Sequence, residues 1–234
     1  MLILGMDTSG KTASVAVYDS ERQVFLAESS IYTSLTHSQV IMPLCQDVLN
    51  RAGKSLDDID SIAVANGPGS YTGLRIGIAS VKAMSFGAEC NVCGVSTLEA
   101  LAYNNTVFQG IVCPVMKARG NLVYTAIYMF KNFICENIMN EKIMPSEELA
   151  EFLSFDAEKV LLCGDGAEDF IKQYKSDKFL LAPPDSRLQN ACGVCLASVN
   201  KSFVSPEQLE VSYMQKVKAE KDLEKHSQNC RFFI

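Results

Sequence analysis

The glycine-rich segment at residues 66–77 constrains the fold of this chain more than any other part of its sequence. It reads Asn-Gly-Pro-Gly-Ser-Tyr-Thr-Gly-Leu-Arg-Ile-Gly, and it joins an apolar run at residues 61–65 to a stretch with helical spacing at residues 72–86. The pattern predicts a turn between a buried strand and a helix. Such a turn presents free backbone N–H groups near the positive end of the helix dipole, so it either binds an anion or is a tight turn that binds nothing. It is not a P-loop, because no Lys-Ser or Lys-Thr follows the second glycine at the required spacing.

Small residues recur along the helix that follows this turn. Gly73, Gly77, Ser80 and Ala83 lie near one face at three- and four-residue spacing. A glycine inside a helix costs about 1 kcal/mol relative to alanine, so two of them indicate that another backbone comes close. That backbone belongs either to a neighbouring strand of the same fold or to a helix of a partner chain. On the second alternative we expect Gly77→Leu to leave the monomer at least partly folded and to weaken assembly.

The rest of the chain alternates between strand and helix patterns. The first half predicts three strands and then helix, strand, helix, strand, helix, which is an α/β unit with a mixed sheet. The second half predicts a similar mixture, and we find no internal repeat in the sequence. The predicted strands are residues 2–6, 13–18, 24–28, 61–65, 92–95, 110–116, 122–130, 134–138 and 159–163, and the predicted helices are residues 38–52, 72–86, 96 onward, 145–153, 168–174 and 190–200. We therefore predict subdomains at residues 1–105 and 106–215 and a polar tail at residues 216–234.

Composition limits the partners and the compartment. The formal net charge is −6, and the lysines of the tail alternate with acidic residues. Strong nucleic-acid binding depends on Lys and Arg neutralising phosphates, so we expect no direct, tight binding. No signal-peptide pattern opens the sequence and no long apolar run crosses it, so we expect a cytoplasmic protein without a membrane segment. In the absence of an export signal, the nine cysteines are expected to be reduced thiols, and their odd number also argues against a complete set of disulfides.

Few side chains are suited to catalysis. Asp7, Thr8 and Ser9 follow the first strand, where they either hold a metal–phosphate group or form an Asx-type turn. The only histidines are His37 and His226, and no Gly-x-Ser-x-Gly elbow is present, so a Ser-His-Asp hydrolase and a histidine metal site are both disfavoured. A Cys-His nucleophile pair stays open but has no local support.

Two Cys-x-x-Cys pairs occur, at residues 90 and 93 and at residues 192 and 195. Together they offer four zinc ligands, or they are small buried hydrophobic residues. The two pairs are about 100 residues apart, whereas the two Cys-x-x-Cys pairs of a zinc ribbon are separated by about 15–20 residues. The spacing therefore favours the alternative that these cysteines are small buried hydrophobic residues.

Several of these segments resemble the TsaB (YeaZ) family. The resemblance rests on Asp-Thr-Ser at residues 7–9, His-Ser-Gln at 37–39, the glycine-rich run at 67–77 and Gly-Val-Ser-Thr-Leu-Glu-Ala-Leu at 94–101, with weaker matches at 118–119, 123–124 and 164–166. It covers residues 1 to about 130 well and is looser beyond. Lys117 stands where the family usually has Asp, Leu122 stands where Glu is usual, and residues 213–215 match the family's Tyr-Leu-Arg only faintly.

The resemblance implies an actin-like ATPase fold built from two ribonuclease H-like subdomains, each with a mixed sheet flanked by helices. It also implies a degenerate paralogue of TsaD, the catalytic subunit of tRNA threonylcarbamoylation. TsaD binds its metal through His-x-x-x-His, and those positions fall at Thr97 and Leu101, neither of which replaces an imidazole. We therefore expect a non-catalytic subunit with no catalytic residue and no metal ligand. The alternatives are an active superfamily enzyme (a threonylcarbamoyl transferase, a small-molecule kinase or a metallopeptidase) and a zinc-dependent binding module.

The resemblance also implies partners. TsaB pairs with TsaD through its first two helices, makes a homodimer through the same surface when alone, and joins an ATPase, TsaE, with tRNA contacted only indirectly. The predicted interface residues are His37, Ile41, Leu44, Cys45, Gly73, Gly77, Ser80 and Ala83. No resident cofactor is expected. At most we expect weak ATP or ADP binding at the subunit boundary, with Asp7, Thr8 and Ser9 as candidate contacts.

Overall fold

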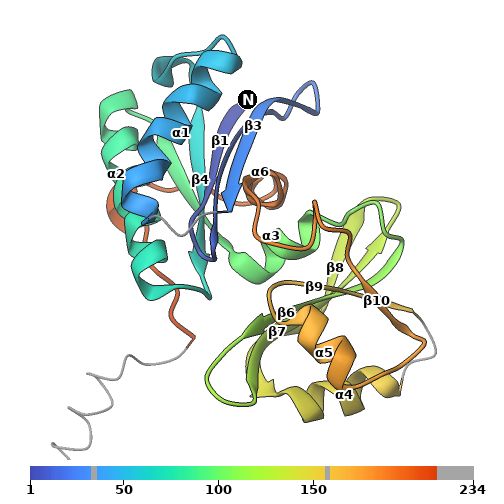
Figure 1. The fold of residues 1–234 in the computed structure, drawn as a ribbon. Coiled ribbons are helices and arrows are strands. Elements are labelled where there is room, and N and C mark those ends of the chain that lie inside the picture. The colour runs from blue at the N-terminus through green and yellow to red at the C-terminus, as the bar shows by residue number, and fades with distance from the viewer. Residues whose placement is uncertain (33–35, 156–158, 215–234) are drawn as a thin grey trace, which may run out of the picture.

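The computed structural model describes residues 1–32, 36–155 and 159–214, and it places them in two lobes that each contain a five-stranded sheet (Figure 1). The first sheet has the order β3-β2-β1-β4-β5. Strand β1 pairs antiparallel with β2 and parallel with β4, so the sheet is mixed as predicted. Its strands are β1 (Leu2–Asp7), β2 (Thr12–Asp19), β3 (Val24–Tyr32), β4 (Ser61–Gly67) and β5 (Asn91–Ser96).

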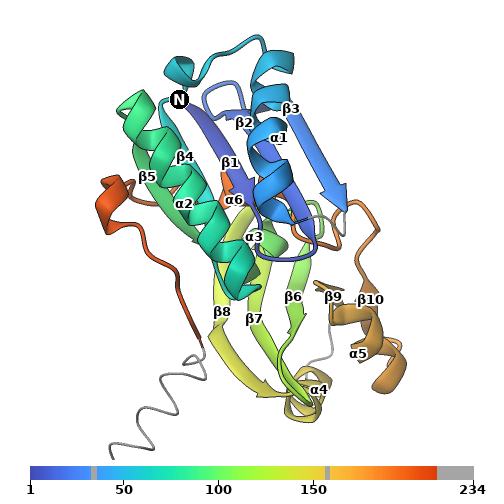
Figure 2. The same cartoon turned by 60° about the vertical axis from the view of Figure 1, so that its left-hand side comes forward.

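Two long helices cover one face of the first sheet. Helix α1 (His37–Arg51) packs on β2 and β3, and α2 (Tyr71–Ala88) packs on β4 and β5. Figure 2 shows them side by side across the same face. Their apolar side chains, at the three- and four-residue spacing that predicted the helices, form one core with alternate residues of the strands.

The second sheet repeats the first in its connectivity. Its order is β10-β9-β6-β7-β8, so β6 to β10 occupy the positions of β1 to β5. Its strands are β6 (Gly110–Lys117), β7 (Leu122–Lys131), β8 (Ile134–Pro145), β9 (Val160–Cys163) and β10 (Phe179–Leu181), and its outer helices are α4 (Ser146–Ser154) and α5 (Ala167–Gln173). The two matching lobes confirm the predicted actin-like, ribonuclease H-like fold.

Two helices lie between the sheets. Helix α3 (Thr97–Tyr103) and helix α6 (Ala191–Ser198) contact each other, and the same α3 packs on β6 and β7. Helix α6 packs on β1, β2 and β4, so the chain returns to the first lobe near its end. The predicted assignment of residues 106–215 to the second subdomain is therefore wrong after about residue 190, because α6 covers the second face of the first sheet.

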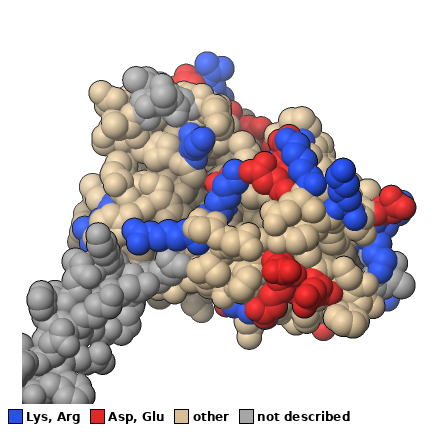
Figure 3. Space-filling view, turned by 60° about the horizontal axis from the view of Figure 1, so that its bottom comes forward, with Lys and Arg blue, Asp and Glu red and all other residues tan. Residues whose placement is uncertain are grey.

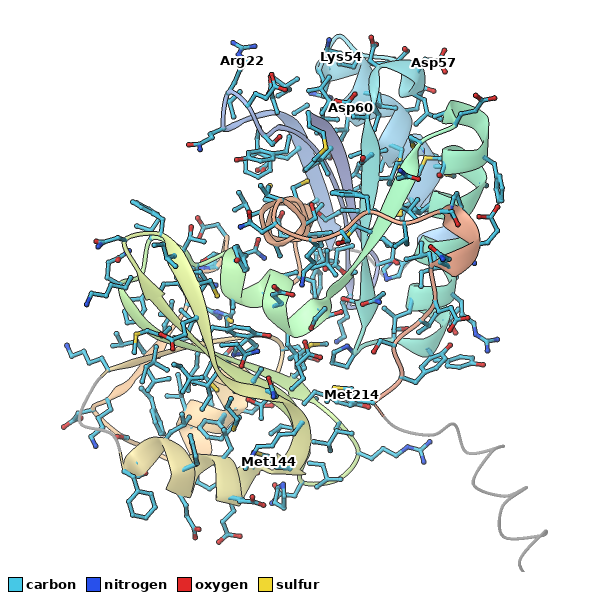
Figure 4. The ribbon with its side chains drawn as sticks, turned by 180° about the vertical axis from the view of Figure 1, so that it is seen from behind. Arg22, Lys54, Asp57, Asp60, Met144 and Met214 are labelled. Carbon is cyan, nitrogen blue, oxygen red and sulfur yellow. The ribbon has the colours of Figure 1, made fainter. Side chains whose placement is uncertain are left out.

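The segment after α6 runs along the edge of the first sheet. The backbones of Val204 and Val92 exchange two hydrogen bonds of 2.8 Å, the short helix η2 (Pro206–Gln208) follows, and Ser212 N donates to Asn66 O at 2.8 Å. Met214 lies near the boundary between the lobes (Figure 4), where it packs against the apolar cluster of α3 and the second sheet. The predicted polar tail at residues 216–234 lies outside the described residues. Within the described part of the chain, no helix combines the length and apolar character that crossing a membrane requires.

Candidate functional site

The end of β1 brings together the first group of predicted site residues. Ser9 N and Ser9 Oγ donate to Asp7 Oδ1 at 2.8 and 2.6 Å, which is the Asx-type turn that the sequence offered as one alternative. Ser70 N at the start of α2 donates to Ser9 O at 2.7 Å, and Thr8 Oγ1 donates to Gly73 O at 2.8 Å. The turn after β1 is thereby fastened to the turn before α2.

The glycines of residues 66–77 make this contact sterically feasible. A methyl group on Gly73 would overlap the backbone oxygen of Thr8, and one on Gly77 would overlap the Thr8 hydroxyl. Gly69 faces Ser9 in the same way, and Gly67 faces the backbone of Ser212. The close approach that the small-residue spacing predicted is therefore made within the same chain, by Thr8 directly after β1 and by Val64 of β4, which is the first of the two alternatives. Gly77 is buried against the Thr8 hydroxyl, so the geometry favours a loss of monomer stability in Gly77→Leu over a selective loss of assembly.

Asp7 carries a buried carboxyl group with only one oxygen bonded. Its Oδ2 has no hydrogen-bond partner among the described residues, and the side chain is fully buried. Burial raises the pKa of Asp7 to about 6, while the two hydrogen bonds from Ser9 and the nearby His37 lower it. The turn therefore contains a titratable carboxyl group, that of Asp7, which is shielded from solvent.

His37 is the first residue of α1 and holds the loop after β1. Its Nε2 lies 2.7 Å from Gly10 O, and since a carbonyl only accepts, Nε2 is the donor. His37 Nδ1 is buried and has no partner in the described part of the chain. The contact joins the start of α1 to the same loop that α2 holds, so Asp7, Thr8 and Ser9 are enclosed by two helices.

The predicted interface residues fall into two groups. Ile41, Leu44 and Cys45 are at most 5% exposed and belong to the core between α1 and the first sheet, as Gly73 and Gly77 belong to the contact with β1. These five offer no surface in the monomer, because the helix face that carries them is the inward one. His37 and Ser80 are half-buried, and Ala83 is exposed.

The outward faces of α1 and α2 present a different set. On α2, Ala79 and Ala83 are exposed and four residues apart, and Phe86 is 59% exposed. On α1, Met42 is 45% exposed. We call Met42, Ala79, Ser80, Ala83 and Phe86 the outer helix face. The sequence indicated Ser80 and Ala83 of this face but neither Ala79 nor Phe86, because small-residue spacing on α2 also serves the buried side.

Thr97 and Leu101, the two positions on which the metal-binding histidines were expected to fall, lie in the core. Thr97 is fully buried at the start of α3, and its Oγ1 has no hydrogen-bond partner among the described residues. Leu101 is 1% exposed and packs among the apolar residues between α3 and the second sheet. Ser96, immediately before α3, caps this helix by accepting hydrogen bonds from Leu98 N and Glu99 N. These residues position α3 and present no ligand to solvent.

The cysteines of the two Cys-x-x-Cys pairs lie in different surroundings. Cys93 and Cys195 are buried in the apolar cluster between the first sheet and α6. Burial raises the pKa of the Cys93 thiol to about 11. Cys192 Sγ lies 2.5 Å from Glu28 Oε2, and Cys90 is half-buried beside α2. In residues 1–32, 36–155 and 159–214 no three His, Cys, Asp or Glu side chains are placed to hold a metal ion.

The second lobe has an equivalent turn after β9, but different side chains surround it. Gly164 and Gly166 face Val115 of β6 as Gly69 and Gly73 face the residues after β1. Lys117 N donates to Asp165 Oδ1 at 3.0 Å, and Lys117 Nζ pairs with Asp169 Oδ2 at 2.6 Å. A hollow of about 300 Å³ lies beside this pair.

Charges at that end of the molecule are mixed. Figure 3 shows acidic side chains gathered in one area with Lys and Arg side chains around it. Helices α4 and α5 begin with the acidic residues Glu147, Glu148, Glu168 and Asp169. Lys54, Asp57, Asp60 and Arg22 mark the opposite end of the molecule, again with both signs (Figure 4). Among the residues that the structure describes, the named side chains at each of these two ends carry both signs of charge, whereas nucleic-acid binding depends mainly on Lys and Arg.

Comparison with known proteins agrees with this architecture. Residues 31–226 match the family model for TsaD, tRNA N6-adenosine threonylcarbamoyltransferase. The tRNA threonylcarbamoyladenosine biosynthesis protein TsaB of Bacillus subtilis (strain 168) is 34% identical over 164 residues, which is 70% of this chain and 71% of that protein. TsaB of Escherichia coli (strain K12) is 38% identical over 130 residues, 55% of each chain. The structure of YeaZ from Pseudomonas aeruginosa superposes with a TM-score of 0.75 at 28% identity, covering 91% of this chain and 99% of that one.

Fold and site together define an actin-like protein of two ribonuclease H-like lobes, with a sealed turn where β1 ends. The chain belongs to the TsaB (YeaZ) family.

Proposed function

We propose that this chain is a non-catalytic, cytoplasmic subunit in the biosynthesis of threonylcarbamoyladenosine in tRNA, and that it binds a catalytic TsaD-type paralogue. The relatives named above support the pathway. The match to the TsaD family model supports a paralogous partner with the same fold, since two related chains offer related helical faces to each other.

The outer helix face is the observation that carries this proposal. Exposed alanines four residues apart let a second helix approach closely, and Met42 and Phe86 supply apolar area beside them. Large apolar side chains that stay exposed around a small-residue stripe are typical of protein–protein contacts. The proposed interface therefore uses Met42, Ala79, Ser80, Ala83 and Phe86 in place of the buried residues that the sequence indicated.

The non-catalytic role is supported by three positions. Thr97 and Leu101 are enclosed in the core, and neither has an imidazole to bind a metal. Asp7 is enclosed by the turn after β1, so a substrate has no direct path to its carboxyl group. An active transferase, kinase or peptidase would need an open site with such groups.

The outer helix face would also serve in assembly with other chains. In the absence of the paralogue, the outer helix face would pair with a second copy of this chain, and a TsaE-type ATPase would join the complex. ATP or ADP would bind weakly at the subunit boundary, and outside the turn of Asp7, Thr8 and Ser9, because these three residues are buried. Contact with tRNA would be indirect, in keeping with the net charge of −6.

Reconstitution tests the proposed function. Threonylcarbamoyladenosine is measured on tRNA with the matching TsaD-type and TsaE-type proteins and the synthase that makes threonylcarbamoyl-AMP, with and without this chain. We expect product only when the chain is added, and none from the chain with tRNA and threonylcarbamoyl-AMP alone. Product that is independent of the chain would refute the subunit role, and product from the chain alone would show that it is the enzyme.

A further inference from the structure

A polar pocket lies at the junction of the lobes, apart from the turn after β1 and from the outer helix face. Its volume is about 470 Å³, within the range of small-molecule sites. Four separate segments line it: Glu99 and Tyr103 come from α3, Tyr128 from β7, Glu141 from β8, and Lys201 from the residues after α6. In Figures 1 and 2, α3 lies beside the sheet that contains β8. A ligand here would contact both lobes at once.

The charges of this pocket do not cancel. Lys201 Nζ pairs with Glu99 Oε2 at 2.7 Å, and both side chains are largely withdrawn from solvent, at 34% and 20% exposed. Glu141 is left over, so the pocket carries one net negative charge. Among the described residues no Lys, Arg or N-terminal amine lies within ion-pair distance of Glu141.

The surroundings of Glu141 penalise its charge. Its pKa is raised by burial and by the nearby Glu99, whereas the Ser96 hydroxyl and Lys201 lower it. A half-buried carboxylate without a cation is unfavourable, and a positively charged ligand would relieve it. The tyrosine ring of Tyr103 and the amide of Asn137 on the same walls offer an apolar surface and further acceptors.

We propose that this pocket binds a small compound with a primary ammonium group, which pairs with Glu141. An ammonium group provides one positive charge and three N–H donors, which matches the leftover charge and the surrounding acceptors. An anion is disfavoured because Lys201 is already paired. A metal ion is disfavoured because the described residues place no three metal-binding side chains here. The bound compound would hold α3 and Lys201 against β8.

Calorimetric titration of the full chain tests this site with putrescine as the probe. Choline, which has a charge but no N–H donor, and L-threonine, which is a zwitterion, are the comparison compounds. We expect putrescine to bind more tightly than either one. Glu141→Gln should weaken putrescine binding roughly 10- to 100-fold, the loss expected for a charge-assisted hydrogen bond. Glu136→Gln, at an exposed position on the same strand, is the matched control and should leave the affinity unchanged.

A second variant is expected to change the affinity for putrescine in the opposite direction. Lys201→Met removes the competing cation, so it should tighten putrescine binding, while circular dichroism checks that each variant is folded. The proposal is overturned if putrescine does not bind the folded wild-type chain, or if Glu141→Gln and Glu136→Gln bind it equally well. It is also overturned if choline binds as tightly as putrescine. None of these outcomes depends on tRNA modification, so the site and the proposed function fail separately.

Discussion

The two lobes share one strand order but use it differently. In each lobe, glycines that follow the fourth strand pack against the backbone at or just after the end of the first strand. Gly69 and Gly73 contact Ser9 and Thr8 in one lobe, and Gly164 and Gly166 contact Val115 in the other. The first lobe then continues into an 18-residue helix, whereas the second continues into one of 7 residues. A long helix beside α1 creates a broad outward face, and a short one does not. The shared turn therefore serves the fold, and the length of the following helix decides which lobe can present a partner surface.

The ends of the two first strands also differ. β1 ends in Asp7, which is fully buried and bonded through one oxygen, and β6 ends in Lys117, which is exposed and paired with Asp169. The first lobe thus carries a destabilising buried acid at a position where the second carries a solvated base.

The largest change in stability is expected from a substitution in the glycine-rich segment at residues 66–77 of the first lobe. Gly73→Ala places a methyl group on the Thr8 backbone, and it should lower the free energy of unfolding by about 3 kcal/mol or more, as severe overpacking does. Gly87→Ala is the matched control in the same helix, because nothing lies within 4 Å of its added methyl group. It should raise stability by about 0.5–1 kcal/mol. Urea unfolding measures both, and equal stability of the two variants would contradict the packing described here.

The next effect concerns the buried acid. The folded-state pKa of Asp7, about 6, lies above the ordinary value of 3.8, so the protonated form is favoured in the folded chain. Its stability contribution is complete below pH 3.8 and is lost as the pH rises through 6. Asp7→Asn should therefore be more stable than wild type at pH 7, by up to about 3 kcal/mol, and nearly equal to it at pH 4.

Urea unfolding at both pH values checks this gap, with Asp57→Asn as an exposed control at the far end of the lobe (Figure 4). The control should change stability by less than about 0.5 kcal/mol at either pH. If Asp7→Asn instead destabilises the chain at pH 7, then the buried carboxylate makes a stabilising contact that the turn does not show.

A smaller loss of stability is expected when the contact between Tyr213, near the end of the described chain, and helix α2 is removed. Tyr213 stacks on Tyr71 with ring centroids 5.3 Å apart, and its hydroxyl accepts from Arg75 Nε at 3.0 Å. Tyr213→Ala should cost about 1 kcal/mol, within the range measured for aromatic pairs, while Tyr213→Phe keeps the stack and should cost less. Thermal unfolding of the two variants measures the difference, and a wild-type melting temperature for Tyr213→Ala would show that the segment is not held there.

The smallest change in stability is expected from removing an exposed ion pair in the second lobe. Lys117→Met removes the pair with Asp169, but both side chains are more than half exposed. Exposed ion pairs contribute little, so the urea midpoint should stay at its wild-type value. A clear loss of stability would mean that the end of β6 is as tightly fastened as the end of β1.

Local patterns predicted most of the elements but not their arrangement. Helical spacing indicated both ends of α1 and α2 to within two residues. Strand β10, with only three residues, carries too little pattern to be recognised, and β8 runs on past residue 138 to Pro145. The duplication of the two lobes left no sequence repeat, because only the hydrogen-bonding order is shared.

The inward and outward sides of a glycine-containing helix were harder to separate. Gly73 and Gly77 face β1, whereas Ala79 and Ala83 face outward, yet all four are small residues at similar spacing. Spacing alone does not say which side meets the sheet. The return of α6 to the first lobe was missed for a related reason: its nearly uniform apolar sequence gives no sided pattern that would reveal its neighbours.

The central claim is that the outer helix face binds a TsaD-type paralogue, and a calorimetric titration of the two proteins from one organism tests it most directly. Ala83→Arg should weaken binding roughly 30-fold or more, as expected for a charge placed in the centre of an interface. Val107→Arg, at a residue that is 83% exposed in the loop before β6, should bind like wild type. If both variants are folded and both bind like the wild-type chain, the paralogue docks elsewhere and the assignment of this face is wrong.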